Sequence, residues 1–284
     1  MSSGFKAKSV SEQFATAWRS KQVRLGFTMT LIALVVALLG PYFAPHAPTD
    51  LVGTAYGKPN GDAWLGYDLL GRDVLSRILA GGQSVVWMSI SASLIAIVIG
   101  SALGVAAAYL RRKTDQFILW VTDVFIAFPD LILVLLIVSL LGREHWLIVL
   151  TVAIAFVPGV IRLSRSIALG VVTQEFIEAA EMMGYSRTQI LFKEIIPNIL
   201  TPLLVHLGIM LTWAVGMLSG LAFLGYGVAP PTADWGLMIN ENRAGLLIQP
   251  IAVFAPVVLI AIFSLGTNLL AEGVGRVTAR IEER

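Results

Sequence analysis

The segment EFIEAAEMMGYSRTQILFKEIIPN, residues 175–198, is a charged block set between two long hydrophobic stretches. The chain of 284 residues is 57% hydrophobic, and only 13% of its residues are charged. Soluble globular proteins carry about 25% charged residues, so the composition indicates a membrane protein. The chain has no cysteine, which excludes disulfides and thiolate metal sites.

Six hydrophobic stretches are long enough, or nearly so, to cross a bilayer, which takes about 20 mainly apolar residues. A chain in lipid must satisfy its own backbone hydrogen bonds, and these stretches lack the alternation of barrel strands, so we expect helices. The sequence therefore predicts an all-α, polytopic membrane protein with six transmembrane helices. They are Phe27–Ala44, Val85–Leu110, Phe117–Leu141, Trp146–Ile161, Ile199–Leu224 and Ile251–Leu270.

Basic residues predict the orientation of these helices, because Lys and Arg accumulate in cytoplasmic segments. If the N-terminus is cytoplasmic, 15 of the 20 Lys and Arg residues fall on the cytoplasmic side. We therefore expect both termini in the cytoplasm, with residues 1–26 as an N-terminal segment and 271–284 as a tail. The six-helix domain then covers residues 27–270, with an external loop at 45–84 and a cytoplasmic hairpin at 175–198.

The hairpin has the local signals of two short helices, Glu175–Met183 and Thr188–Ile196. Gly184 between them permits the positive φ that ends many helices, and Ser186 can cap the second helix. Pro197 can begin the next span, because the first residues of a helix need no N–H acceptor. Composition alone leaves two interpretations open: a surface hairpin joining two spans, or a helix that inserts into a groove on a cytoplasmic partner.

The spacing within the hairpin resembles a known signature. Glu178-Ala179-Ala180, three residues, Gly184, twelve residues and Pro197 are similar to the EAA motif in permease subunits of binding-protein-dependent ABC importers. That resemblance implies an importer-type bundle and a coupling helix that docks into an ATPase. The chain departs from the motif at Glu194 and Ile196. The implied ATPase-coupling residues are Glu178, Ala179, Ala180, Met183, Gly184, Arg187 and Pro197.

A second resemblance lies in the predicted external loop, in WLGYDLLGRDVLSR at residues 64–77. This segment is similar to the LGTDxxGRDxLSR motif of the dipeptide/oligopeptide/nickel branch, with Tyr67 in place of threonine. Asp234-Trp235-Gly236 is similar to another element of that branch, whereas the C-terminal tail differs from it. We expect the loop's charges to form a local polar network at the entry to the second span, with a direct substrate role as the alternative. The motif residues are Leu65, Gly66, Asp68, Gly71, Arg72, Asp73 and Arg77.

Taken together, the resemblances imply a dipeptide-type "C" permease that forms half of a translocation path for short peptides. The implied partners are a homologous, non-identical permease, two cytoplasmic ATPases that carry the ATP and Mg, and an external substrate-binding protein. We expect this chain to catalyse no reaction and to bind no cofactor, metal or nucleic acid. We also expect it to lie in the cytoplasmic (inner) membrane of a bacterium or archaeon. Dipeptides, oligopeptides, nickel chelates, glycosides and opines all remain candidate substrates.

Two intramembrane acids support a competing hypothesis. Asp123 and Asp130 are seven residues apart in the third predicted span and would lie on nearly one helical face. Such acids are costly in lipid, so a stand-alone channel or secondary carrier could use them as a relay. The alternative is structural, with Asp123 paired to Arg111, Arg112 or Arg162. Small residues at Gly100 and Gly104 also predict a helix-packing face in the second span.

Overall fold

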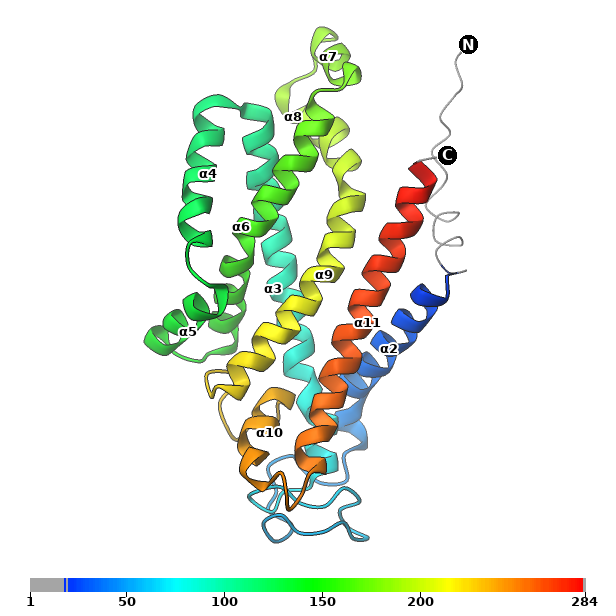
Figure 1. Ribbon diagram of the computed structural model, residues 1–284, viewed down its shortest axis with the longest axis vertical. Helices are drawn as coiled ribbons and strands as arrows, with labels where there is room; N and C mark the ends of the chain where they lie inside the picture. Colours follow the sequence, from blue (N-terminus) through cyan, green and yellow to red (C-terminus); the bar gives the residue numbers. More distant parts are fainter. Residues whose placement is uncertain (1–17, 19, 283–284) are drawn as a thin grey trace.

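The computed structural model describes residue 18 and residues 20–282, which form a bundle of long helices (Figure 1). The predicted N-terminal segment falls mainly on residues 1–17 and 19, outside the described residues. No β-strand occurs in the described part of the chain, where only isolated bridges join Leu51 to Arg72 and Tyr67 to Asp73. The helices are α2 (Lys21–Leu39), α3 (Val74–Leu110), α4 (Arg112–Ile126), α5 (Asp130–Leu141), α6 (His145–Val172), α7 (Glu175–Met182), α8 (Arg187–Ile190), α9 (Ile196–Phe223), α10 (Trp235–Asn242) and α11 (Ile251–Glu282).

Among the described residues, five helical stretches are long and apolar enough to cross a membrane. They contain α2, α3, α6, α9 and α11, and a sixth span results if α4 and α5 count as one broken crossing. The predicted all-α, six-span architecture is therefore confirmed, with one span of unexpected shape.

That span is broken, because α4 and α5 meet at an angle of 81°. Pro129 precedes α5 as its N-cap. A proline lacks an N–H donor and disfavours helical backbone at the residue before it, so the helix stops near Phe128. The prediction that Asp123 and Asp130 share one helical face is therefore wrong, since they lie on different helices.

Helices α3 and α6 approach each other closely at two glycines of α3, as the small-residue pattern predicts. A Cβ added at Gly100 would lie 2.5 Å from the Val160 Cβ, and one at Gly104 would lie 2.0 Å from the Ser164 Oγ. The Ser164 hydroxyl lies 3.1 Å from the Gly100 carbonyl oxygen, to which it can donate. Glycine is thus required at both positions for this helix pair to pack.

Several helices run past the apolar stretches that predicted them. Helix α6 continues to Val172, eleven residues beyond the predicted end of the fourth span. The second arm of the hairpin also runs without interruption from Arg187 through a π-helical segment, Leu191–Ile195, into α9. In that segment the Ile196 N–H donates to the Leu191 carbonyl, five residues back, so Pro197 lies within a continuous helical path and does not begin a separate span.

The bundle has two distinct ends (Figure 1). Helix α7 marks one end, here called the hairpin end, and both the start of α2 and the end of α11 lie toward it. The loop before α3 and the helix α10 lie at the opposite end, the loop end. The side of the membrane that each end faces remains a prediction from the basic residues.

Candidate functional sites: the hairpin and the loop cluster

The turn of the hairpin is fixed by backbone hydrogen bonds around Gly184. The Tyr185 N–H donates to the Ala180 carbonyl at 3.1 Å, and the Gly184 N–H donates to the Glu181 carbonyl at 3.0 Å. This pair of bonds is the Schellman ending of a helix, and it places Gly184 at φ +80°. A Cβ added at Gly184 would meet no atom within 4 Å, so glycine is favoured here by its backbone angle and not by lack of space.

The second arm begins with the cap that the sequence predicts. The Gln189 N–H donates to the Ser186 Oγ, and the Ser186 N–H donates in return to the Gln189 Oε1 at 2.9 Å. The Lys193 ammonium lies 5.9 Å from the centre of the Tyr185 ring and adds a cation–π contact across the turn. The turn between α7 and α8 is therefore fixed on both sides of Gly184, by the Schellman ending before it and by the capping box after it.

One face of the hairpin is buried against the bundle. Ile177, Ala180, Ile190 and Ile195 are buried in a hydrophobic cluster with residues of α3, α6 and α9. The resemblance to the EAA motif implied that Ala179 and Ala180 both belong to the surface that contacts the ATPase. Ala180 instead packs inside this chain, and Ala179 is half-buried. A small side chain at Ala180 thus lets α7 lie close to its own bundle.

The opposite face of the hairpin is open. Met182 is 83% exposed and Met183 is 67% exposed, and the Phe176 side chain is also exposed. Exposed methionines are flexible apolar groups that adapt to an irregular partner surface. Beside them run the exposed acids Glu175, Glu178 and Glu181, and the remaining predicted coupling residues, Gly184, Arg187 and Pro197, are exposed as well.

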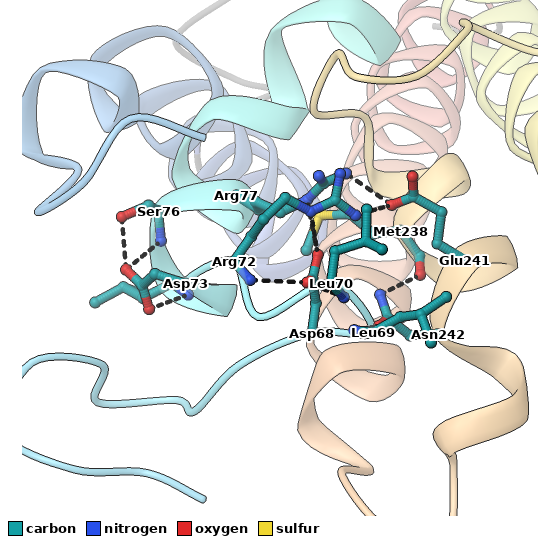
Figure 2. Close-up of polar contacts among 11 residues, drawn as sticks. Asp68, Leu69, Leu70, Arg72, Asp73, Ser76, Arg77, Met238, Glu241 and Asn242 are labelled. Atoms are coloured by element: carbon teal, nitrogen blue, oxygen red, sulfur yellow. Dashed lines mark hydrogen bonds and ion pairs between the residues drawn. The ribbon is translucent and has the colours of Figure 1, made fainter. Parts of the chain in front are cut away.

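The loop end carries a compact set of four charged side chains, here called the loop cluster: Asp68, Arg72, Arg77 and Glu241 (Figure 2). The Arg72 Nε lies 2.6 Å from the Asp68 Oδ2, and the Arg72 Nη2 lies 2.7 Å from the Glu241 Oε2. The Arg77 Nη2 lies 2.9 Å from the same Glu241 oxygen. Asp68, Arg72 and Arg77 are almost wholly buried and the Glu241 side chain is 13% exposed, so two positive and two negative charges balance with little access to water.

The predicted polar network therefore exists, but its membership differs from the prediction. Glu241 joins it from α10, far along the chain, and Asn242 accepts a hydrogen bond from the Leu69 N–H at 2.9 Å. Asp73 lies apart and caps α3, accepting from the Ser76 N–H at 3.1 Å and the Ser76 hydroxyl at 2.6 Å. No sequence signal distinguished Glu241 or Asn242 from other loop residues.

Two glycines of the loop motif have backbone angles that favour glycine. Gly66 has φ +76° and Gly71 has φ +78°. A Cβ at Gly66 would lie 2.0 Å from the Gln249 Nε2, and one at Gly71 would lie 2.1 Å from the Gly53 carbonyl oxygen. Gln249 also donates to the Leu65 carbonyl at 2.9 Å, so the motif is held against the segment that precedes α11.

The Asp234-Trp235-Gly236 element ties α10 to α3. Asp234 caps α10 through the Leu237 N–H at 3.0 Å and accepts from the Ser84 hydroxyl at 2.6 Å. Burial raises the pKa of this carboxyl above its ordinary value, while these hydrogen bonds oppose the rise. The Trp235 Nε1–H donates to the Ile78 carbonyl at 2.8 Å, so the buried indole fixes α10 against the start of α3.

Residues 82–279, which include the hairpin, match the family described as binding-protein-dependent transport system inner membrane component. The chain belongs to this family. The glutathione transport system permease protein GsiD of Escherichia coli strain 536 is 32% identical over 277 residues, which cover 93% of this chain and 90% of the relative. GsiD of Pectobacterium atrosepticum is 34% identical and covers 86% and 82%. A putative peptide transport system permease protein of Brucella suis biovar 1 is 30% identical and covers 90% and 86%.

A solved structure shares the fold of this permease. The inward-facing MetNI methionine ABC transporter aligns with a TM-score of 0.55 at 19% identity, over 71% of this chain and 96% of the matched chain. At this identity the match shows a common fold and nothing about substrate. The predicted importer-type bundle is thus confirmed.

The permease places its two candidate relay acids in different surroundings. The Asp123 Oδ1 lies 2.7 Å from the Arg162 Nη2, which is one of the pairings expected from the sequence. Both side chains are more than half exposed, at 60% and 52%. Asp130 lies in the first turn of α5, beyond the break. The two acids therefore do not form one relay surface on a common helix.

Proposed function

We propose that this permease is one of two membrane subunits of an ATP-driven importer and forms half of a path for short peptides. Relatives that align over most of its length are named for glutathione, itself a tripeptide, and for peptide transport. A non-identical permease, two cytoplasmic ATPases and an external binding protein would complete the assembly. Both termini and the hairpin would face the cytoplasm, and ATP and Mg would be bound by the ATPases.

The observation that carries this proposal is the asymmetry of the hairpin. One face is embedded in the helix bundle through Ile177, Ala180 and Ile190, while the other exposes Met182 and Met183 beside an acidic edge. A hairpin packed in this way transmits force, because interdigitated core side chains resist relative movement. ATPase closure would push the exposed face, and the connected helices α6 and α9 would move with it.

Charge reversal at Glu178 tests this role. We expect Glu178→Arg to reduce ATP-dependent peptide uptake about tenfold or more, within the range of about 5–150-fold that a typical coupling free energy gives. The side chain is exposed, so expression of the chain is expected to stay normal. Uptake of a labelled peptide and ATP hydrolysis by the purified assembly are measured in parallel.

Thr173→Ala is a suitable matched control, because Thr173 is exposed in the connection just before α7 and its hydroxyl bonds only within the chain, to the Leu169 and Gly170 carbonyls. Normal coupled uptake by Glu178→Arg would contradict the docking role. Transport that persists after ATP depletion, by a chain that purifies without partners, would contradict the importer itself.

The competing carrier hypothesis makes the opposite prediction for the intramembrane acids. We expect Asp123→Asn to leave peptide uptake nearly unchanged, because its carboxylate pairs with Arg162 and an importer driven by ATP needs no proton relay. Asp130→Asn is expected to behave in the same way. Uptake measured at several external pH values provides the check, since loss of uptake in either variant would favour a proton-relay mechanism.

A further inference from the structure

A groove of about 300 Å³ lies between α3, α4 and α6, on the hairpin side of the break in the third span. Its walls are almost purely apolar, and several of its side chains are exposed. The one hydroxyl in the lining, that of Thr122, already donates to the Ile118 carbonyl at 2.7 Å. The lining residues used below are Leu103 on α3, Phe117, Val121 and Phe125 on α4, and Val157 and Ile161 on α6.

The size of the groove limits what can enter it. Phe117 and Phe125 are eight residues apart, so the groove extends about 12 Å along α4 at a rise of about 1.5 Å per residue. A volume of about 300 Å³ spread over that length leaves room for a single extended chain within the groove, whereas a whole helix, with a diameter of about 10–12 Å, would not enter it.

The chemistry of the groove excludes a peptide as that chain. A peptide backbone would lose its hydrogen bonds to water and find no partner among these side chains, which is costly in an apolar site. A hydrocarbon chain carries no such penalty. The occupant that fits the walls is therefore an acyl chain.

Three consecutive basic residues, Arg111, Arg112 and Lys113, lie at the junction of α3 and α4, the two helices that form adjoining walls of the groove. Their side chains are exposed, and within the described residues they make no hydrogen bond or ion pair. Arg111 and Arg112 have φ values of 52° and 50°, a backbone region that residues other than glycine rarely adopt. Strain of this kind persists where the surrounding structure requires it, often at ligand sites.

The neighbouring acids do not neutralise these three charges. Asp115 is held by Arg165, with its two oxygens at 2.5 and 2.7 Å from the guanidinium, and Asp123 is held by Arg162. The junction therefore keeps three uncompensated positive charges. The exposed rings of Phe117 and Trp120 stack 6.4 Å apart nearby, and tryptophan is typical of the level of lipid headgroups.

We propose that this groove is a binding site for an anionic phospholipid. One acyl chain lies along α4 between Phe117 and Phe125, and the headgroup phosphate contacts Arg111, Arg112 and Lys113. Bound lipid would fill the space between α4 and the α3–α6 pair, and so fix the position of α4 beside its broken continuation.

Photolabelling of the full-length chain in phosphatidylcholine vesicles that contain a minority of phosphatidylglycerol tests this proposal. Two tracer lipids carry the same photoactivatable acyl chain, one on a phosphatidylglycerol and one on a phosphatidylcholine headgroup. Mass spectrometry then maps the labelled peptides. We expect the phosphatidylglycerol tracer to label the groove peptides of α3, α4 and α6 about fivefold more strongly or better, because each basic residue at an anionic lipid headgroup contributes about fivefold in affinity.

Two kinds of variant separate the headgroup from the acyl chain. The double variant Arg111→Ala/Arg112→Ala is expected to lower phosphatidylglycerol labelling severalfold toward the phosphatidylcholine level, because only Lys113 remains at the junction, whereas Arg111→Lys/Arg112→Lys is expected to retain most of it. Val157→Trp, which fills the groove, is expected to abolish labelling of these peptides by both tracers. Leu136→Trp on the exposed face of α5 and Arg143→Ala near the loop end are the matched controls and leave labelling unchanged.

Equal labelling by the two tracers in the wild-type chain would overturn the proposal, because ordinary surrounding lipid gives that result. Labelling that Val157→Trp leaves unchanged would overturn it as well. The unfolding temperature shows whether the double alanine variant is folded. If it is not, the proposal is still tested by Val157→Trp, which should abolish labelling, and by Arg111→Lys/Arg112→Lys, which should retain it.

Discussion

Replacing Gly184 by proline is expected to abolish coupled transport while leaving the helix bundle in the membrane. Proline fixes φ near −65°, whereas Gly184 has φ +80°, and it removes the N–H that donates to the Glu181 carbonyl. The Schellman ending of α7 cannot form without that angle and that bond. The exposed tip at Met182 and Met183 would then point elsewhere, away from the ATPase surface that we propose it contacts.

Gly184→Asn is the matched control at this position, because asparagine adopts the left-handed backbone conformation more readily than most residues. The space beside Gly184 is also open to a side chain. We expect the asparagine variant to keep most of the ATP-dependent uptake and Gly184→Ala to fall between the two. Uptake is measured together with the amount of chain in the membrane. Equal uptake by the proline and asparagine variants would show that the elbow angle has no role in coupling.

The hairpin shows why some of this site could be predicted from sequence. Gly184 and Ser186 are signals that act through local backbone hydrogen bonds, and both lie in the structure as predicted. The burial of Ala180 could not be read in the same way, because it depends on where α3 and α6 pass beneath α7. Local chemistry thus fixed the turn, and packing at a distance decided which face of α7 stayed open.

The membrane spans show the same division. Hydropathy identifies the stretches that prefer lipid, and it predicted six. The described residues have five such helices, or six spans if α4 and α5 count as one broken crossing. Hydropathy does not report where a helix ends, so α6 runs on through Arg162 and Arg165 to Val172. Pro129 was visible inside the third span, but a proline in a helix can either kink it or end it, and the surrounding packing decides which occurs.

Glu241 is the clearest case of a residue that could not be assigned to the loop cluster from the sequence. Asp68 and Arg72 belong to one motif and form an i, i+4 ion pair, so their proximity follows from local spacing. Glu241 reaches the same point from α10, 169 positions beyond Arg72. A single sequence offers no means of pairing it with the motif, because only the tertiary packing of α10 on α3 and α11 brings it there.

Removal of the Glu241 carboxylate is the second substitution expected to have a large effect. Glu241→Ala would leave Arg72 and Arg77 buried with only Asp68 as a counter-charge, and removing one partner of a buried ion pair costs about 3–5 kcal/mol. We expect a lower unfolding temperature of the purified chain and less protein in the membrane. Asp62→Asn, a change at an exposed acid of the same loop, is the matched control and should leave both quantities unchanged.

The conservative variant Glu241→Gln separates charge from hydrogen bonding. Its amide oxygen can still accept from one guanidinium, so we expect a loss of stability smaller than that of Glu241→Ala, with the net positive charge still uncompensated. If charge balance holds the cluster together, removing a positive charge at the same time should restore part of the stability, and Glu241→Gln/Arg72→Gln is the variant to measure. Unfolding temperatures that rank the double variant below Glu241→Gln would show that Arg72 contributes through its side-chain hydrogen bond to Asp68 and not through charge balance, because that bond is lost when Arg72 is replaced.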